Sequence, residues 1–194
     1  MTRLGKSRNN ELAVRKVILY VAASLDNYIA RPDGNVDWLN APELQLPGED
    51  YGYKEFYGSI DTTLMGHRTY RAILGFDVPF PYPDKTNYVF SRSGTREESG
   101  DVTFITGDVA AFVRTLKEMP GRDIWLVGGG QINTLLLEHR LIDRMILTLI
   151  PLLLGEGVPL FHGKPVETGF KAVSGHYFSN GVVQWILDPL KPKK

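Results

Sequence analysis

The stretch DIWLVGGGQINTLLL, residues 123–137, decides the fold predicted for this chain. It starts with an apolar run typical of a buried strand and ends with apolar residues at helical spacing. Three consecutive glycines, Gly128, Gly129 and Gly130, separate the two parts. A glycine turn from a strand into a helix lets bare backbone N–H groups approach an anion closely. The pattern therefore indicates a nucleotide or another anion, with a tight turn that binds nothing as the alternative.

The composition is that of one globular domain without a strongly charged partner. The chain has 194 residues, of which 43% are hydrophobic and 23% are charged. Lys+Arg and Asp+Glu each number 22, and no apolar run is long enough for a membrane span, so we expect no nucleic-acid or membrane partner. The chain has no cysteine, which is compatible with a cytoplasmic protein. Its four histidines lack metal-ligand spacing, so we expect no metal site.

The chain is expected to form a single domain. The polar N-terminal segment lacks the apolar core of a signal peptide, and we expect a disordered extension over residues 1–14. No repeat or linker interrupts the remainder, which predicts one domain over residues 15–190.

Hydrophobic patterns predict the secondary structure. Strands are expected at residues 16–24, 62–65, 87–91, 102–105, 124–127, 143–151, 170–178 and 182–187, and helices at 50–58, 68–74, 107–119 and after Gly130. Residues 40–49 and the proline-rich 75–85 are expected to be loops. Asn180-Gly181 predicts a hairpin turn. This order indicates an α/β fold with a mixed, mainly parallel sheet, helices on both faces and an antiparallel pair at the C-terminus.

Five stretches carry a resemblance to a known family. They are VAASLDNYIARPDGNVDWL (21–39), LMGHRTYRAI (64–73), NYVFSRS (87–93), WLVGGGQI (125–132) and LTLIPLLLGEGVPLF (147–161). In this order they resemble the dihydrofolate reductase superfamily, and within it the reductase domain of the riboflavin-biosynthesis deaminase-reductase and its stand-alone relatives. The resemblance implies a three-layer α-β-α dihydrofolate reductase-like fold. A Rossmann dehydrogenase is a poor fit, because its glycine turn follows the first strand.

The resemblance also implies NADPH as cofactor, with NADH possible. The three glycines with Gln131 and Ile132 would hold the pyrophosphate, with a cis peptide bond between Gly128 and Gly129. The other implied cofactor contacts are Ala23, Gly66, His67, Arg68, Thr69, Ser91, Arg92 and Ser93. His67 stands where the family commonly has arginine, which leaves the preference for NADPH open.

The substrate side is defined less sharply. Matched positions suggest a pocket containing Asp26, Tyr53, Phe56 and Thr148. Trp38 and Asp50 are the candidate catalytic residues. Trp38 is weighed equally as a core residue, and for Asp50 the stronger alternative is a helix N-cap.

These features lead to an NADPH-dependent reductase of a small heterocyclic, carbonyl or imine substrate, similar to 5-amino-6-(5-phosphoribosylamino)uracil reductase. In that family branch the substrate is a pyrimidine phosphate. The deaminase motifs are absent from this chain. The alternatives are a non-catalytic nucleotide-binding protein of the same fold and a true dihydrofolate reductase. A homodimer is implied by the relatives, with the C-terminal hairpin as a candidate edge.

Overall fold

The computed structural model describes residues 14–76, 78–92 and 100–191, and an eight-stranded sheet forms the centre of this part. The order across the sheet is β5-β4-β3-β6-β1-β7-β10-β9. The strands are β1 (Val17–Ser24), β3 (Ile60–Gly66), β4 (Thr86–Phe90), β5 (Thr103–Ile105), β6 (Asp123–Gly128), β7 (Arg144–Ile150), β9 (Phe170–Tyr177) and β10 (Val183–Pro189). Each of β5, β4, β3, β6, β1 and β7 runs parallel to its neighbours in this group. Strand β10 is antiparallel to both β7 and β9. This confirms the predicted mixed, mainly parallel sheet.

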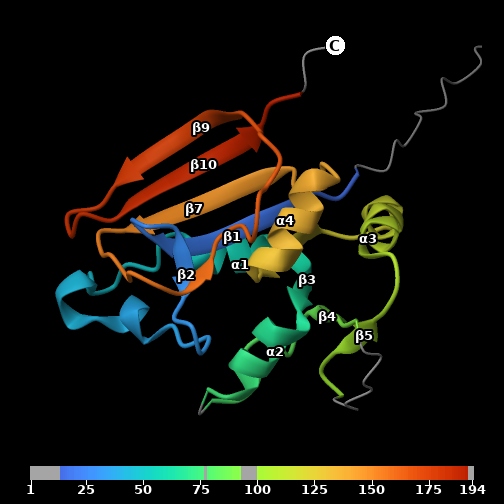
Figure 1. The fold of residues 1–194 in the computed structure, drawn as a ribbon, viewed down its shortest axis with the longest axis horizontal. Helices are drawn as coiled ribbons and strands as arrows, with labels where there is room; N and C mark the ends of the chain where they lie inside the picture. The colour runs from blue at the N-terminus through green and yellow to red at the C-terminus, as the bar shows by residue number, and fades with distance from the viewer. Residues whose placement is uncertain (1–13, 77, 93–99, 192–194) are drawn as a thin grey trace, which may run out of the picture.

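Helices cover both faces of the sheet and make three layers. They are α1 (Tyr53–Ser59), α2 (His67–Leu74), α3 (Val109–Glu118) and α4 (Gly130–Glu138). The apolar residues of α3 and α4 join one core cluster, and those of α1 and α2 join another. Figure 1 shows α4 crossing one face of the sheet next to β1, and the β9–β10 hairpin at the far edge.

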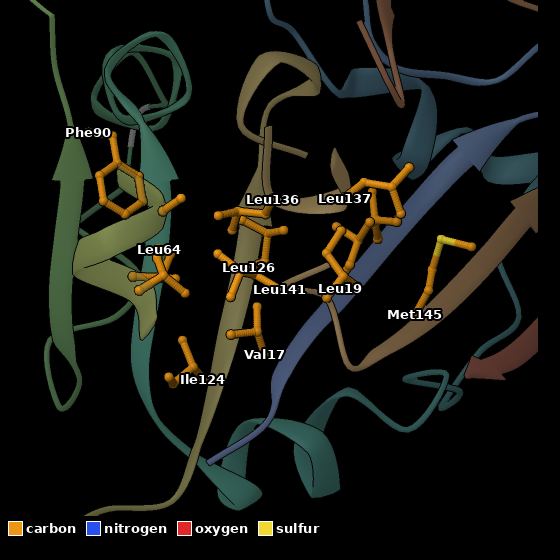
Figure 2. Packing of buried hydrophobic residues seen from close by; sticks show 14 of the residues in the cluster. Val17, Leu19, Leu64, Phe90, Ile124, Leu126, Leu136, Leu137, Leu141 and Met145 are labelled. Atoms are coloured by element: carbon orange, nitrogen blue, oxygen red, sulfur yellow. The ribbon is translucent and has the colours of Figure 1, made fainter. Parts of the chain in front are cut away.

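Alternation along the strands assigns side chains to the two cores. In β1, Val17 and Leu19 face the α3–α4 side and Ile18 faces the α1–α2 side. Figure 2 shows the first of these cores, where Leu126 of β6 lies among side chains from β1, β3 and α4. Leu126 is fully buried. The central strands are apolar on both faces, as expected for a parallel sheet covered by helices.

Two features were not predicted from the sequence. The loop expected at residues 40–49 begins with short 3-10 helices, at Asp37–Asn40 and Pro42–Leu44. A second small sheet pairs β2 (Tyr28–Ala30) with β8 (Val158–Pro159). Both strands are too short to give a periodic pattern, and their pairing joins segments that are far apart in the chain.

The segment that leads into β1 is held by a buried arginine, whereas the edge strand β9 is open to solvent. Arg15 is buried and donates hydrogen bonds to the Arg122 carbonyl at 2.5 Å and to Thr62 at 2.6 Å, besides its ion pair with Asp61. Strand β9 at the other edge is exposed along nearly its whole length. The predicted extension, residues 1–14, lies outside the described residues except for Val14. None of the described helices is long and apolar enough to cross a membrane.

Candidate functional site

The site begins where two central strands diverge. Strands β1 and β6 pair only from Val17 to Leu19, and β1 continues to Ser24 paired with β7 alone. Beyond this point the indole Nε1 of Trp125 donates to the Tyr20 carbonyl oxygen at 3.1 Å. The chain leaves β6 through the glycine turn into α4, and leaves β1 through a loop on its way to α1. Such a switch point at the carboxyl ends of parallel strands is where α/β proteins bind ligands.

Two helices start side by side at this edge of the sheet. Met65 of β3 pairs with Gly128 of β6, so the first turns of α2 and α4 follow adjacent strands. Neither helix has a side-chain N-cap. The backbone N–H of Gly129 donates to Thr69 Oγ1 at 3.0 Å, which joins the two turns directly. The site therefore presents two helix N-termini whose first N–H groups are left for a ligand or solvent.

The three glycines of the turn have different structural roles. Gly128 has a φ of 110°, which disfavours any side chain. A Cβ on Gly129 would lie 2.9 Å from Thr69 Oγ1, and one on Gly130 would lie 2.3 Å from the Pro159 carbonyl oxygen. The predicted cis bond between Gly128 and Gly129 is wrong, because every described peptide bond is trans. The positive φ of Gly128 makes the turn instead.

Two exposed arginines border the helix starts. Arg68 lies in the first turn of α2, and Arg92 follows β4, whose Phe90 pairs with Gly66 of β3. His67 differs from them, because its Nε2 is buried without a hydrogen-bond partner among the described residues, and its ring packs edge-on against Phe104 at 6.1 Å. Among the described residues, Arg68 and Arg92 are thus the exposed arginines that this edge offers to a phosphate.

The remaining cofactor candidates have separate environments. Ser91 is buried at the end of β4, and Ser93 lies outside the described residues. Gln131 is exposed at the start of α4, and Ile132 is half-buried. Ala23 is fully buried in β1.

A cavity of about 230 Å³ lies next to β1 on the α1 side of the sheet. Its lining consists of Tyr20, Ala22, Leu39, Asn40, Leu44, Gln45, Tyr51, Tyr53, Thr148 and Ile150. Tyr53 and Thr148 of the predicted pocket are among them. The floor comes from neighbouring strands, where Ala22 pairs with Thr148. The loop before α1 and the first residue of that helix form the opposite wall.

A hydrogen-bond network holds this wall against the sheet. The Tyr20 hydroxyl donates to the Tyr51 carbonyl oxygen at 3.0 Å. Gln184 Nε2 donates to the same oxygen and to Thr148 Oγ1, both at 2.9 Å. The Asn180 amide donates to the Tyr51 hydroxyl at 2.7 Å. Tyr51 has a φ of 54°, an uncommon conformation for a non-glycine residue that this network maintains.

The electrostatics of the cavity favour uncharged groups. Burial raises the pKa of Tyr20 to about 12, against the opposing hydrogen bond from Gln184, and the negative charges of Asp50 and Glu49 add to the rise. The Tyr20 phenol is therefore neutral at physiological pH. Glu49 and Asp50 are held in the wall by backbone N–H groups: Glu49 accepts from Tyr51 at 2.8 Å, and Asp50 from Gly52 at 2.9 Å.

Four predicted site residues lie outside the cavity lining. Asp50 also accepts from the Lys54 N–H at 3.1 Å, so its carboxylate caps the start of α1; its catalytic role stays a prediction that this geometry does not support. Trp38 is buried beside Ile150, and no described group pairs with its Nε1. Phe56 lies behind the cavity and stacks on Tyr20 at 4.4 Å. The fourth, Asp26, binds a distant loop.

The Asp26 carboxylate joins the end of β1 to the chain after β7. It accepts from the Leu154 and Gly155 N–H groups at 3.1 and 2.7 Å and from the Ser24 hydroxyl at 2.5 Å. The Ser24 hydrogen bond, followed by those from the two N–H groups, lowers the pKa of Asp26. Its position is that of a loop anchor.

The sequence alone did not identify Tyr20, Tyr51 or Gln184 as site residues. Tyr20 interrupts the apolar run of β1 with a hydroxyl, which is the one signal that was available. Tyr51 and Gln184 come together only through the antiparallel pairing of β10 with β7. No group of described residues has the arrangement of a metal site.

The turn fits a dinucleotide by its own geometry. A Cβ at Gly129 would press on Thr69 Oγ1 and one at Gly130 on the Pro159 carbonyl oxygen, so the backbone of the turn stays bare beside the helix starts, and two exposed arginines stand at the same edge. Bare N–H groups with arginines nearby are the chemistry that binds phosphates.

Comparisons with known proteins show the family of this chain and its fold. The family model for the RibD C-terminal domain matches residues 15–184. The uncharacterized protein YwjB of Bacillus subtilis is 40% identical over 169 residues, which are 87% of this chain and 95% of that protein. The crystal structure of a putative riboflavin biosynthesis protein from Shewanella sp. PV-4 has a TM-score of 0.81 at 29% identity and covers 91% of this chain and 99% of that chain.

More distant structures show the fold alone. A deaminase/5-amino-6-(5-phosphoribosylamino)uracil reductase from Thermotoga maritima has a TM-score of 0.67 at 17% identity, covering 91% of this chain and 57% of that one. Dihydrofolate reductase from Enterococcus faecalis, complexed with NADP(H), also has a TM-score of 0.67, at 15% identity, covering 91% of this chain and 97% of that one. The fold is therefore that of dihydrofolate reductase, as expected from the sequence. This chain belongs to the RibD C-terminal domain family.

Proposed function

We propose that this protein is an NADPH-dependent reductase of a small heterocyclic substrate. The observation that carries the proposal is the pair of uncapped helix N-termini, those of α2 and α4, joined by the hydrogen bond from Gly129 to Thr69. A single helix start in a protein commonly binds only water. Two that meet at a strand switch point beside bare glycine backbone are suited to a pyrophosphate.

Each part of the site has a role in this proposal. The N–H groups at Gly130 and Gln131 hold the pyrophosphate from the α4 side, and those at Arg68 and Thr69 hold it from the α2 side. Arg68 and Arg92 bind the phosphate that distinguishes NADPH from NADH, because a guanidinium offers paired donors to phosphate oxygens. Tyr20, Ala22 and Thr148 form the floor on which the substrate ring lies.

Bound NADPH supplies a hydride for an imine or carbonyl carbon. The protein's residues orient the substrate and exclude water from the cavity. The lining contains no carboxylic acid or histidine. Tyr20 is a poor acid because its pKa is raised to about 12. We therefore propose that the proton comes from water at the open rim, near Asn40 and Gln45.

Nucleotide binding tests the proposal most directly. We would titrate the protein with NADPH and NADH and follow the intrinsic fluorescence of its three tryptophans, of which Trp125 packs against Tyr20 at the cavity. The expected result is saturable quenching by both nucleotides, with NADPH bound at least tenfold more tightly. The variant Arg114→Gln is a matched control for variants of Arg68 and Arg92, since Arg114 is exposed on α3. Absence of quenching by either nucleotide would refute the proposal.

Two other functions remain to be separated from this one. A protein that binds NADPH but oxidises it with no pterin, pyrimidine or quinone would be the non-catalytic nucleotide-binding member. True dihydrofolate reductase activity would require an acid at the substrate, and Asp50 is the candidate that the sequence offers. Asp50→Asn would abolish dihydrofolate reduction if that function were correct, whereas our proposal expects its main effect on the stability of α1. The cytoplasmic location and the homodimer stay predictions.

A further inference from the structure

The substrate cavity differs from a phosphate site in its lining. None of its ten lining residues is a lysine, arginine or histidine. Arg31 in the preceding loop is already bound by both oxygens of Asp37, at 2.6 and 3.2 Å. Lys54 follows Tyr53 in α1, but it is exposed and is not part of the lining. A phosphate dianion in this cavity would lose hydration without gaining a charged partner, which is strongly unfavourable.

The nearest fixed charges in the wall have the wrong sign for a phosphate. Glu49 and Asp50 flank Tyr51, and their carboxylates are held there by the N–H groups of Tyr51, Gly52 and Lys54. Both negative charges act on the Tyr20 phenol, where they disfavour its ionisation. An anion bound beside Tyr20 would experience the same repulsion, because the field does not depend on which group carries the charge.

The polar side chains that line the cavity are all uncharged, and on the strand side they are Tyr20 and Thr148. Thr148 Oγ1 accepts a hydrogen bond from Gln184, and no described residue accepts the hydrogen of the Thr148 hydroxyl. The direction of this hydrogen bond follows from the Tyr51 carbonyl oxygen, which can only accept. The Gln184 atom beside that oxygen must therefore be the amide nitrogen Nε2, and the same nitrogen donates to Thr148 Oγ1. Tyr20 donates its own hydrogen to the same carbonyl, and its oxygen keeps a second lone pair besides the one that faces Gln184. On its strand side the cavity thus offers the Thr148 O–H as a donor and the Tyr20 phenolic oxygen as an acceptor, while Asn40, Gln45, Tyr51 and Tyr53 line the remainder.

Size sets a further limit. The cavity of about 230 Å³ is smaller than the roughly 300 Å³ at which pockets begin to enclose drug-sized ligands. It is bordered by the rings of Tyr20, Tyr51 and Tyr53, which suit a flat molecule. The enclosed part of a substrate is therefore one small ring system.

We propose that this cavity takes an uncharged, phosphate-free heterocycle with a lactam edge, whose C=O accepts from Thr148 and whose N–H donates to Tyr20. The inference rests on the proposed reductase function and narrows it, since it separates this chain from reductases that act on phosphorylated pyrimidines. Gln184 is a positioning residue in this arrangement, because it orients the Thr148 hydroxyl.

The test compares two ligands that differ only in the phosphate. The probes are 5-amino-6-(5-phosphoribosylamino)uracil and the same compound without its phosphate, titrated by calorimetry into the full-length protein saturated with NADP⁺. We expect the phosphate-free compound to bind at least tenfold more tightly. Equal or tighter binding of the phosphorylated compound would overturn the inference, and so would failure of both compounds to bind. NADP⁺ binding is measured separately, and its absence would count against the reductase proposal itself.

Variants at the rim and the floor locate the effect. Gln45 is exposed at the rim, and Gln45→Arg should reduce the ratio of the two affinities at least fivefold, whereas the uncharged control Gln45→Met should keep it. Thr148→Val should weaken the phosphate-free compound about tenfold, and Thr148→Ser should restore it, because serine keeps the donor. A ratio that Gln45→Arg leaves unchanged would show that charge at the cavity does not set the preference.

Discussion

The hydrogen bond between the two helix starts gives the sharpest prediction. Thr69→Val keeps the β-branched shape of the side chain and removes the oxygen that accepts from Gly129 N–H at 3.0 Å. Both residues are half-buried, so water replaces the lost partner only in part. A net loss of about 1 kcal/mol of unfolding free energy is expected, within the roughly 0.5–1.5 kcal/mol of an ordinary hydrogen bond. For a chain of this size that corresponds to a decrease in Tm of about 2–4 °C.

The same variant should weaken cofactor binding more than it weakens the fold. Without Thr69 Oγ1 the Gly129 peptide can rotate, and the N–H groups of both turns are then no longer aligned on one ligand. A loss of about 1.4 kcal/mol in binding corresponds to a tenfold rise in the Kd for NADPH. Fluorescence titration and thermal unfolding on the same samples measure the two effects separately.

Two controls decide how the result is interpreted. Thr115→Val removes a hydroxyl that donates to the Ala111 carbonyl at 3.2 Å on the exposed side of α3, and should leave NADPH affinity unchanged. Thr69→Ser should restore most of the affinity. If Thr69→Val loses stability as expected but binds NADPH within twofold of the unchanged protein, the joined helix starts are not the pyrophosphate site and the reasoning fails.

Three further predictions concern the phosphate edge, the glycine turn and the loop anchor. The double variant Arg68→Gln/Arg92→Gln should reduce the preference for NADPH over NADH at least tenfold in the same titration, while NADH affinity changes less than threefold. Gly130→Ala should prevent stable folding, measured by circular dichroism, because its Cβ would lie 2.3 Å from the Pro159 carbonyl oxygen. Asp26→Asn should lower the urea midpoint at pH 7, and the difference from the unchanged protein should vanish in acid. The pKa of Asp26 is lower in the folded protein than in the unfolded chain, so its carboxylate stabilises the fold at pH values above its pKa in the unfolded chain. This contribution is lost as the pH falls through the pKa that Asp26 has in the folded protein.

Local sequence was sufficient for the elements that depend on periodicity and turn chemistry. The apolar run before the glycines predicted β6, and the helical spacing of the apolar residues in 107–119 predicted α3, whose buried residues are Ala110, Val113 and Leu116. The hairpin turn at Asn180-Gly181 was equally local, and Gly181 has the positive φ that such a turn requires.

The two helix starts of the candidate site were also predictable from the sequence. A strand, a glycine turn and a helix that follow one another are encoded in one short segment. The helix N-terminus that results can therefore be predicted from local sequence. The cis bond between Gly128 and Gly129 was inferred from the resemblance alone, whereas every described peptide bond is trans and Gly128 has a positive φ. His67 illustrates a second limit, because its packing against Phe104 and its buried Nε2 depend on the tertiary structure.

The sequence by itself determined that a glycine turn joins β6 to α4 in an α/β protein, and that the turn is suited to an anion. Tertiary structure alone decided which groups form the cavity. Tyr20, Tyr51, Thr148 and Gln184 belong to four separate segments, and their hydrogen bonds depend on strand register and on the wall before α1. Local patterns carry no information about such pairings, because register is set by the packing of the whole sheet.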